Sequence, residues 1–261
     1  MTLEIDGYSL KQMLDQQNNM CAGCGMKISK LYIRRMQYCN YYNKLFCQRC
    51  HQGAKMRIPA RVIHQWNFRE YPVSDIARRF LLDNYSQPAI DVLAVDAHFY
   101  DKFKNLRNVR LLRLQLVHLW SFIRICSTAK STFTMHGNLL SVFSCIPKHI
   151  LEDVNLYSML DFEDVKNGNL IRLIEPVVQY GKCHVNSCEV SICRFVCELC
   201  DQRDDLLFPF QLNKVSRCEE CGSLSHIKCA ARRIKQLLPC PKCVRIALNR
   251  LMLLLINLDV F

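Results

Sequence analysis

The chain has 261 residues and is half hydrophobic, with only 8 Gly and 8 Pro, a composition that excludes a disordered or low-complexity protein. Its N-terminus is acidic without a secretory apolar segment, and its longest apolar run (251–256) is far shorter than the roughly 20 residues of a membrane span. We therefore expect a soluble, cytoplasmic protein that is not transmembrane. The formal charge of +12 suits a polyanionic partner, although thiolate-bound metal ions would offset part of it.

Cysteines are concentrated near both ends of the sequence. Of the 17, five fall in residues 21–50 and ten in residues 183–243. Because thiols stay reduced in the cytosol, we interpret the CxxC pairs as metal ligands and not as disulfides. The resulting division is a lead segment (1–20), an N-terminal zinc module (21–58), a helical region (59–182) and a C-terminal zinc module with a terminal helix (183–261).

The N-terminal module contains one complete set of four thiolates. Tetrahedral zinc needs four such ligands, and they come from two CxxC pairs: Cys21 and Cys24, Cys47 and Cys50. Residues 39–47 between the pairs predict a hairpin with Asn43 near its turn. Cys39 and His51 are left over, and each is either a ligand of a second metal or a side chain packed nearby.

The middle region predicts helices. Ser74 and Asp75 are typical of a helix start, with the helix running through Leu82, and Pro88 predicts the start of another. Residues 161–182 predict a helix, an Asn-Gly turn and a second helix that ends near Gly181. A last helix, roughly 243–257, is too apolar to be fully solvated and is expected to pack on the core, a partner or a membrane.

One helix of the middle region carries a clear apolar stripe. Hydrophobic residues recur every three or four positions, as expected of a buried helix face: Leu106, Val109, Leu112, Leu116, Leu119 and Ile123. Four basic residues lie largely off this stripe: Lys104, Arg107, Arg110 and Arg113. They form either a solvated face or a basic surface for a lipid or an acidic partner.

The C-terminal module contains four pairs of potential ligands in sequence. They are Cys197 and Cys200, Cys218 and Cys221, His226 and Cys229, and Cys240 and Cys243. Alternation of the pairs gives two interlocked sites, one made by the first and third pairs and the other by the second and fourth. Since every set is full, no position is left for a substrate water, and a structural role is favoured over zinc catalysis.

His184 leaves an alternative open. It lies thirteen residues before Cys197 and could replace one of the last two cysteines at the second site. Alternatively, His184, Cys188 and Cys193, with or without Cys183, form a further site. We therefore expect three to four zinc ions. The fold expected is mainly α with small zinc-stapled β elements, a helical middle flanked by treble-clef-like and cross-brace (PHD/FYVE-like) zinc modules.

These motifs together resemble one known family, the Rubicon homology domain. The similarity runs from Cys21 to about Val244 through CAGCG (21–25), YC (38–39), LFCQRCH (45–51), IPARV (58–62), W-x-F (66–68), LRLQL (112–116), IPKHILEDVNLYSMLDF (146–162), FPF (208–210), CEEC-x4-H-x2-C (218–229) and CPKC (240–243). The sequence departs from the family pattern at Ser191, where a cysteine is expected. This puts the zinc that would use His184 and Cys188 in doubt.

The resemblance implies a non-enzymatic adaptor that binds a late-endosomal Rab GTPase in its GTP form. It further implies a role in autophagosome maturation or endosome–lysosome traffic, at the surface of late endosomes and lysosomes. The GTPase is expected at the helical face near 104–113 together with the terminal zinc module. A phosphoinositide membrane surface is a second expected partner, because Lys27, Arg34 and Arg35 surround the first knuckle.

Two other functions use similar zinc modules. A RING-type ubiquitin ligase has cross-braced zinc, but here His226 follows both knuckles, an order closer to a PHD finger. A PHD-like chromatin reader would suit the charge, but the gap before residue 240 lacks the usual Trp, and no interleaving of basic and aromatic residues indicates nucleic-acid binding. We therefore expect no nucleic-acid partner.

Overall fold

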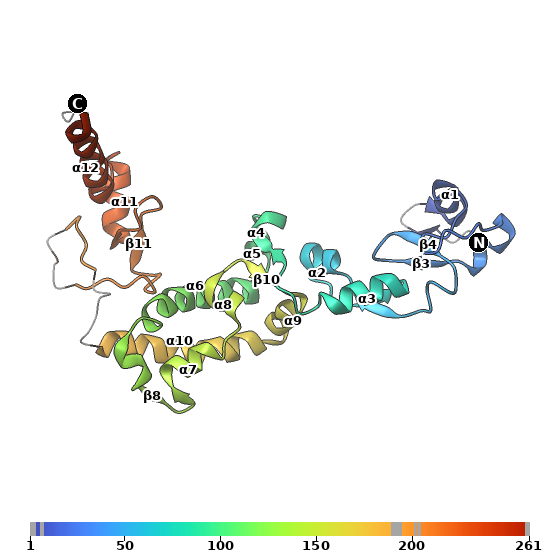
Figure 1. Cartoon of the computed structure of the whole chain (residues 1–261), viewed down its shortest axis with the longest axis horizontal. Coiled ribbons are helices and arrows are strands. Elements are labelled where there is room, and N and C mark those ends of the chain that lie inside the picture. The colour runs from blue at the N-terminus through green and yellow to red at the C-terminus, as the bar shows by residue number, and fades with distance from the viewer. Residues whose placement is uncertain (1–3, 6–7, 189–194, 201, 203–204, 259–261) are drawn as a thin grey trace. The chain divides into compact units, whose positions relative to one another are not determined.

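The computed structural model describes residues 4–5, 8–188, 195–200, 202 and 205–258, and shows helices together with small two-stranded antiparallel sheets (Figure 1). The expected helical fold with small β elements is confirmed. The chain forms two compact units, Met1–Arg107 with Asn155–Leu170, and Asn108–Val154 with Ile171–Phe261. Both units therefore include parts of the helical region 59–182. Ser191 and Cys193 lie outside the described residues.

The first unit combines short helices with four two-stranded sheets, which pair β1 with β2, β3 with β4, β5 with β6 and β7 with β10. Its elements are β1 (Glu4–Ile5), β2 (Tyr8–Ser9), α1 (Leu10–Gln16), the 3₁₀ helix η1 (Lys30–Arg35), β3 (Gln37–Cys39), β4 (Lys44–Phe46), β5 (Lys55–Arg57), α2 (Pro59–Gln65), β6 (Glu70–Pro72), α3 (Asp75–Asp83), β7 (Ile90–Asp91), α4 (Val92–Val95), α5 (Phe99–Lys102), β10 (Leu156–Tyr157) and α9 (Met159–Asn167).

The lead segment packs into the core of this unit. Leu14 on α1 is fully buried in the same apolar cluster as Leu45 and Phe46 of β4 and Val73. The hairpin of β3 and β4 has the expected turn at Asn43, whose φ of 54° is a conformation that Asn tolerates better than most residues. Helix α1 of the lead segment thus contributes directly to the core beside the first cysteine cluster.

A second apolar region of this unit surrounds Trp66. The indole stacks on Phe103 with ring centroids 4.6 Å apart and meets Phe99 and Phe162 at 5.9 and 6.1 Å. Trp66 ends α2 in a left-handed conformation, with φ of 53°. Aromatic packing of this kind contributes beyond simple area burial, which explains why a bulky residue occupies an unfavourable backbone region.

The second unit contains the two longest helices. Its elements are α6 (Lys104–Ile123), which begins in the first unit, the 3₁₀ helix η2 (Ser127–Lys130), β8 (Phe133–Thr134), β9 (Gly137–Asn138), α7 (Leu139–Ser144), α8 (Lys148–Glu152), α10 (Asn169–Ser187), which also begins in the first unit, β11 (Val215–Arg217), β12 (Leu224–His226), α11 (Ile227–Lys235) and α12 (Pro241–Leu258). Sheets pair β8 with β9 and β11 with β12. Among the described residues, the helices fall short of the length and apolarity that crossing a bilayer requires.

Helix starts follow the expected capping chemistry in most places. Ser74 caps α3 by accepting from the N–H of Ala77, as predicted. The prediction that Pro88 opens a helix is wrong. Asp91 caps α4 instead, because its carboxylate accepts from the N–H groups of Leu93 and Ala94.

The Asn-Gly turn between α9 and α10 is confirmed, with Gly168 in the left-handed region at φ of 74°. The predicted end near Gly181 is wrong, since α10 continues to Ser187. A Cβ at residue 181 would lie 2.9 Å from Phe143 and 3.1 Å from Leu119. The glycine therefore permits close packing of α10 against α6 and α7, and does not end the helix.

The expected basic face of α6 is partly wrong. Leu106, Val109, Leu116 and Ile123 are buried as predicted, but Leu112 is only half-buried and Arg113 is fully buried in the same stripe. The guanidinium of Arg113 donates to the carbonyl oxygens of His149 and Asp153, at 3.1 and 2.6 Å.

Arg113 is therefore a buried structural residue that holds the C-terminal end of α8. It is not part of a surface. Of the other three basic residues, Lys104 and Arg107 are exposed and Arg110 is half-buried.

Candidate metal centres

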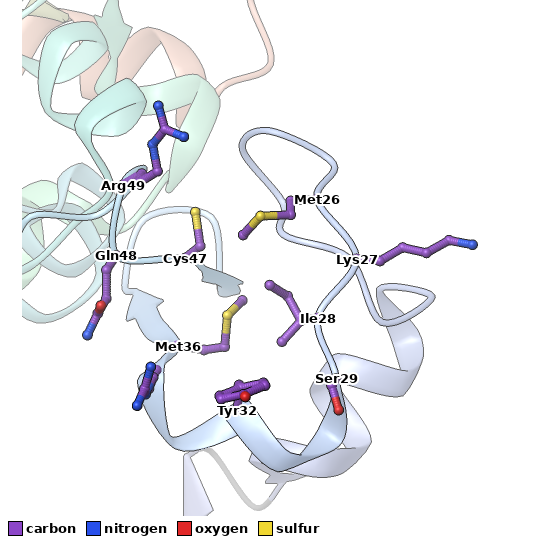
Figure 2. A pocket seen from close by; sticks show the side chains of 10 residues that line it. Met26, Lys27, Ile28, Ser29, Tyr32, Met36, Cys47, Gln48 and Arg49 are labelled. Carbon is purple, nitrogen blue, oxygen red and sulfur yellow. The ribbon is translucent and has the colours of Figure 1, made fainter.

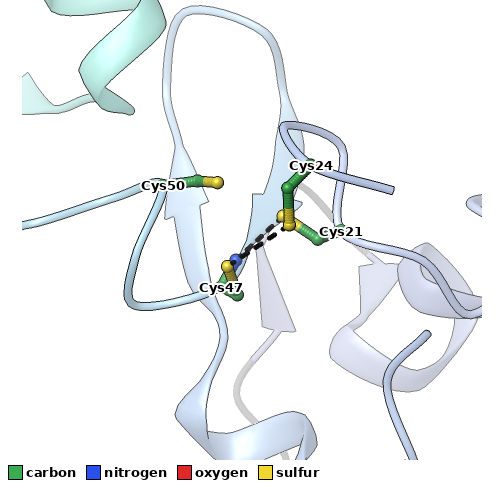
Figure 3. Close-up of side chains that lie close together, drawn as sticks. All are labelled: Cys21, Cys24, Cys47 and Cys50. Carbon is green, nitrogen blue, oxygen red and sulfur yellow. Dashed lines mark hydrogen bonds between the residues drawn. The ribbon is translucent and has the colours of Figure 1, made fainter. Parts of the chain in front are cut away.

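The first cysteine cluster joins two knuckles of the first unit (Figure 3). Cys21 and Cys24 follow α1, and Cys47 and Cys50 follow β4; all four sulfurs lie within 4.8 Å of one another. The sulfurs of Cys24 and Cys47 are 3.8 Å apart. A Cβ at Gly23 would approach the Cβ and Sγ of Cys50 to 3.0 Å, so only glycine fits between the knuckles.

Backbone donors already favour a thiolate at Cys21. Burial by itself raises the pKa of the Cys21 thiol, but the N–H groups of Cys24, Cys47 and Gly23 outweigh it and lower that pKa to about 7. Two of these contacts are 3.2 Å (Cys47 N) and 3.4 Å (Gly23 N) from the Cys21 sulfur. A thiolate is the form that binds metal.

Cys39 and His51 do not join this cluster. The Cys39 sulfur is fully buried and accepts from the N–H of Ser74 at 3.2 Å. His51 is buried between the carbonyl of Tyr38 and the N–H of Gly53, both 3.2 Å from its ring nitrogens. Neither belongs to a group of three or more ligands within the described ranges, and both therefore act as packed polar residues.

The C-terminal module brings its four pairs together in the alternating order. One cluster contains Cys197, Cys200, His226 and Cys229, and the other contains Cys218, Cys221, Cys240 and Cys243. A single hairpin explains this pairing. The knuckle that begins at Cys218 is the turn between β11 and β12, and His226 is the last residue of β12. The turn of the hairpin thus supplies Cys218 and Cys221 to one cluster. The last residue of its second strand, His226, belongs to the other cluster.

Two knuckles, one in each module, share one local geometry. In each, a glycine follows the second cysteine with positive φ, 71° at Gly25 and 69° at Gly222. Each glycine N–H donates to the carbonyl of the first cysteine, Cys21 or Cys218, at 3.0 and 2.9 Å. Because only glycine adopts this conformation without strain, the CxxCG pattern encodes the knuckle locally.

His226 is oriented for ligation by a residue that sequence reasoning did not assign. Its Nδ1 lies 3.4 Å from the sulfur of Cys200 and 3.8 Å from that of Cys229, and its Nε2 lies 3.1 Å from Asp205 Oδ2. A carboxylate behind a ligating histidine fixes the ring and its tautomer. Lys214 pairs with the same carboxylate and, as the main cause, holds the pKa of Asp205 below its usual value.

The other C-terminal cluster is tight. The sulfurs of Cys218 and Cys243 are 3.7 Å apart and those of Cys221 and Cys240 are 3.6 Å apart. The hydroxyl of Ser223 lies 3.3 Å from the sulfurs of both Cys221 and Cys240. The hydrogen bond with this hydroxyl is the main reason why the pKa of the Cys221 thiol is lowered to about 6.

A fourth group of ligands lies in the helical part of the second unit and includes a residue that the sequence did not indicate. Cys126, just after α6, lies 3.3 Å from His184 Nε2 and 3.8 Å from the sulfur of Cys188. His184 is not part of the cluster of Cys218, so the replacement considered from its spacing is not the arrangement found. Cys183 is exposed and outside the group.

Hydrogen bonds fix the tautomer of His184. Thr132 Oγ1 donates its only proton to the carbonyl of Thr128 at 2.9 Å, so it must accept from His184 Nδ1 at 3.1 Å. The Nδ1 position then carries the proton, and the lone pair of Nε2 faces Cys126. This is the tautomer that a metal ligand requires.

Sulfur–sulfur distances in three of the groups fit zinc. A tetrahedron with Zn–S bonds of about 2.3 Å has sulfur–sulfur edges of about 3.8 Å, and four sulfur pairs in these groups are 3.6 to 3.8 Å apart. A disulfide would need about 2.05 Å. Three groups contain four donors and the fourth contains three.

Comparison with known proteins identifies the family of this chain. Residues 37–248 match the family described as the Rubicon Homology Domain. The mouse Run domain Beclin-1-interacting and cysteine-rich domain-containing protein is 36% identical over 236 residues, covering 90% of this chain and 23% of that protein.

Two further relatives are similar to the same extent. The mouse Protein associated with UVRAG as autophagy enhancer is 35% identical over 235 residues, covering 90% of this chain and 34% of that protein. The human Pleckstrin homology domain-containing family M member 3 is 33% identical over 245 residues, which cover 93% of this chain and 30% of that protein. The chain thus spans about a quarter to about a third of the length of these relatives, while the family match extends over most of its own residues. From that match and the cysteine pattern, the chain belongs to the Rubicon homology domain family.

Proposed function

We propose that this protein is a zinc-stabilised adaptor module that binds a GTP-loaded late-endosomal Rab GTPase and thereby regulates autophagosome maturation and endosome–lysosome traffic. Two relatives carry names that point in this direction, one as Beclin-1-interacting and the other as an autophagy enhancer associated with UVRAG. We assign this chain a non-enzymatic regulatory role at the cytoplasmic surface of late endosomes and lysosomes.

The observation that carries the proposal is that three of the clusters each contain four donors, which is the full number for tetrahedral zinc. Each has a full tetrahedral set, so zinc bound there would have no position for a substrate and would serve only to hold the backbone. Structural zinc contributes on the order of 10 kcal/mol to the folding of small domains. We assign the first cluster to a treble-clef-like module and the two interlocked clusters to a cross-brace module, which together give rigid surfaces for a partner.

The fourth group is proposed to hold a zinc ion as well. His184 has the tautomer that a metal ligand requires, with the lone pair of Nε2 toward Cys126. Burial raises the pKa of the Cys126 thiol, but the hydroxyl and the N–H of Thr128 oppose this effect, and the pKa is lowered to about 6. Cys126, His184 and Cys188 would provide three ligands. The protein is therefore expected to carry four zinc ions when fully loaded.

The exposed start of α6 is the proposed contact for the GTPase. Lys104 and Arg107 are exposed there, and the Arg107 guanidinium is held by the carbonyl of Asp101 at 3.1 Å. Arg113 is buried and is therefore not part of this surface. Basic side chains at such a surface mainly accelerate association and select an acidic partner.

The test is a pull-down with a late-endosomal Rab loaded either with a non-hydrolysable GTP analogue or with GDP. Selective retention of the GTP form, weakened in Lys104→Glu/Arg107→Glu and unchanged in Lys11→Glu, is the expected result; Lys11 is an exposed basic residue of α1. Equal and negligible retention of both nucleotide forms would rule the GTPase out. Flotation with phosphoinositide vesicles tests the membrane as a second partner.

A further inference from the structure

A hollow beside the first cysteine cluster is not used by the proposed function. It has a volume of about 360 Å³ and lies between the first knuckle and η1. Figure 2 shows Met26, Ile28, Tyr32 and Met36 around this hollow, with Lys27 and Arg49 directed away from it. The hollow therefore has apolar walls and a basic rim. Its volume is in the range of pockets that bind small molecules, about 300–1,000 Å³.

The walls are held in place without a ligand. The N–H of Cys21 donates to the carbonyl of Met26 at 2.9 Å, and the N–H of Ile28 donates to the carbonyl of Asn19 at 2.7 Å. On the opposite side Met36 is buried in the core, and the Arg35 guanidinium lies 5.2 Å from the ring centroid of Tyr32. A preformed hollow loses little entropy when it is filled.

Apolar surface continues out of the hollow into solvent. Met26 is 48% exposed, Tyr32 is 55% exposed and the neighbouring Leu31 is 88% exposed. Exposed apolar side chains grouped around a hollow are typical of a binding site. Methionine walls also adapt to differently shaped apolar side chains, because the thioether chain is flexible and polarizable.

The chain segment that forms the hollow carries charged side chains of one sign. From Gln16 to Arg69 the chain contains ten Lys or Arg residues and no Asp or Glu. Lys27, Arg35 and Arg49 are exposed, and in the described part of the chain none of them forms an ion pair. A zinc ion held by four thiolates would subtract two charges, which leaves the region strongly positive.

We propose that this hollow binds a short acidic peptide segment of a partner protein, which places one apolar side chain between Met26, Tyr32 and Met36 and its carboxylates against Lys27, Arg35 and Arg49. The apolar side chain contributes affinity by leaving water. The carboxylates select the partner and accelerate its association. This site is separate from the exposed start of α6 proposed for the GTPase, and it requires only that the first unit is folded.

The arrangement favours a peptide over a lipid head group. Recognition of a phosphate needs several donors that converge on one point. Here Lys27 and Arg49 diverge from the hollow and the groups that converge are apolar (Figure 2).

The test uses the full chain, zinc-loaded, as bait for a random peptide display library. We expect the recovered peptides to be rich in Asp and Glu and to share one Leu, Met, Phe or Trp. A fluorescent copy of one such peptide should bind about tenfold more weakly to Met26→Glu, because tenfold corresponds to about 1.4 kcal/mol, the scale of one apolar contact. Arg49→Glu should weaken it similarly.

Two matched variants serve as controls. Ile76→Glu introduces the same acidic side chain at a residue that is 45% exposed on α3, and Lys55→Glu reverses an exposed charge on β5. Both should bind the peptide as the parent protein does. Circular dichroism and zinc content establish that every variant is folded, and GTPase retention in the same variants separates this site from the proposed function.

Three outcomes would overturn the peptide site. The first is a library selection without acidic enrichment, and the second is equal loss of binding in the controls. The third is vesicle binding, to phosphatidylserine in phosphatidylcholine, that is lost in Met26→Glu while the recovered peptides still bind. That last result would assign the hollow to a membrane surface.

Discussion

Arg113 gives the sharpest test of the structure, because its buried position contradicts the simplest interpretation of the sequence. Replacement by Met keeps the length of the side chain but removes the donors to the carbonyls of His149 and Asp153 at 3.1 and 2.6 Å. Loss of a donor to a buried carbonyl costs about 1–3 kcal/mol. The His149 carbonyl keeps the N–H of Asp153 as a donor, which reduces the cost at that oxygen.

We therefore expect Arg113→Met to lower the free energy of unfolding by about 2–4 kcal/mol. Arg113→Lys should recover only part of this, because an ammonium lacks the planar fork that reaches two acceptors. The matched control is Arg107→Met on the exposed part of the same helix, where a change below about 0.5 kcal/mol is expected.

The assay is urea unfolding at constant zinc concentration, followed by tryptophan fluorescence, to which both Trp66 and Trp120 contribute. Trp120 stacks on Phe143 with ring centroids 5.9 Å apart. GTPase retention is measured on the same samples. If Arg113→Met unfolds like the parent protein and yet loses the GTPase, Arg113 is a surface contact and the reasoning from its burial is wrong.

Three other predictions concern single positions. Native mass spectrometry should find four zinc ions in the parent protein, three in Cys126→Ser and four in the exposed control Cys145→Ser; an unchanged count in Cys126→Ser would remove Cys126 from the ligands. Cys39→Ser should keep the full zinc content but unfold at a lower temperature, and loss of one zinc ion would show that Cys39 is a ligand after all. Gly181→Ala should lower the free energy of unfolding by about 1 kcal/mol, because overpacking against Phe143 outweighs the better helix propensity of Ala; a more stable variant, as at an exposed helix position, would refute the close packing.

The parts of this protein that depend on neighbouring residues could be predicted from the sequence. Each knuckle needs only a CxxC pair, and Gly25 and Gly222 supply the left-handed residue that closes the turn. The cap at Ser74 and the turn at Gly168 are equally local. These features are decided by backbone sterics and by hydrogen bonds within a few residues, which short motifs describe well.

Hydrophobic periodicity was less reliable where a polar residue is buried. Arg113 lies in the buried stripe of α6 because α8 presents two carbonyl oxygens to it, and α8 is more than thirty residues away in sequence. Residue type predicts a helix end at Gly181, whereas its lack of a side chain permits the close contact with Phe143. Residue type alone does not distinguish these roles, because the deciding atoms belong to other elements.

The sequence by itself determined the ligand pairs, the helical middle and the family. Only the tertiary structure decided which ligands meet. It brings Cys126 to His184 across 58 positions, aligns Asp205 behind His226, and leaves Cys39 and His51 in ordinary packing. It also forms the apolar hollow between Met26 and Met36 inside a basic region. The physical reason is one of range: turn geometry and capping act over a few bonds, whereas metal coordination, buried hydrogen bonds and hollows depend on where distant segments pack.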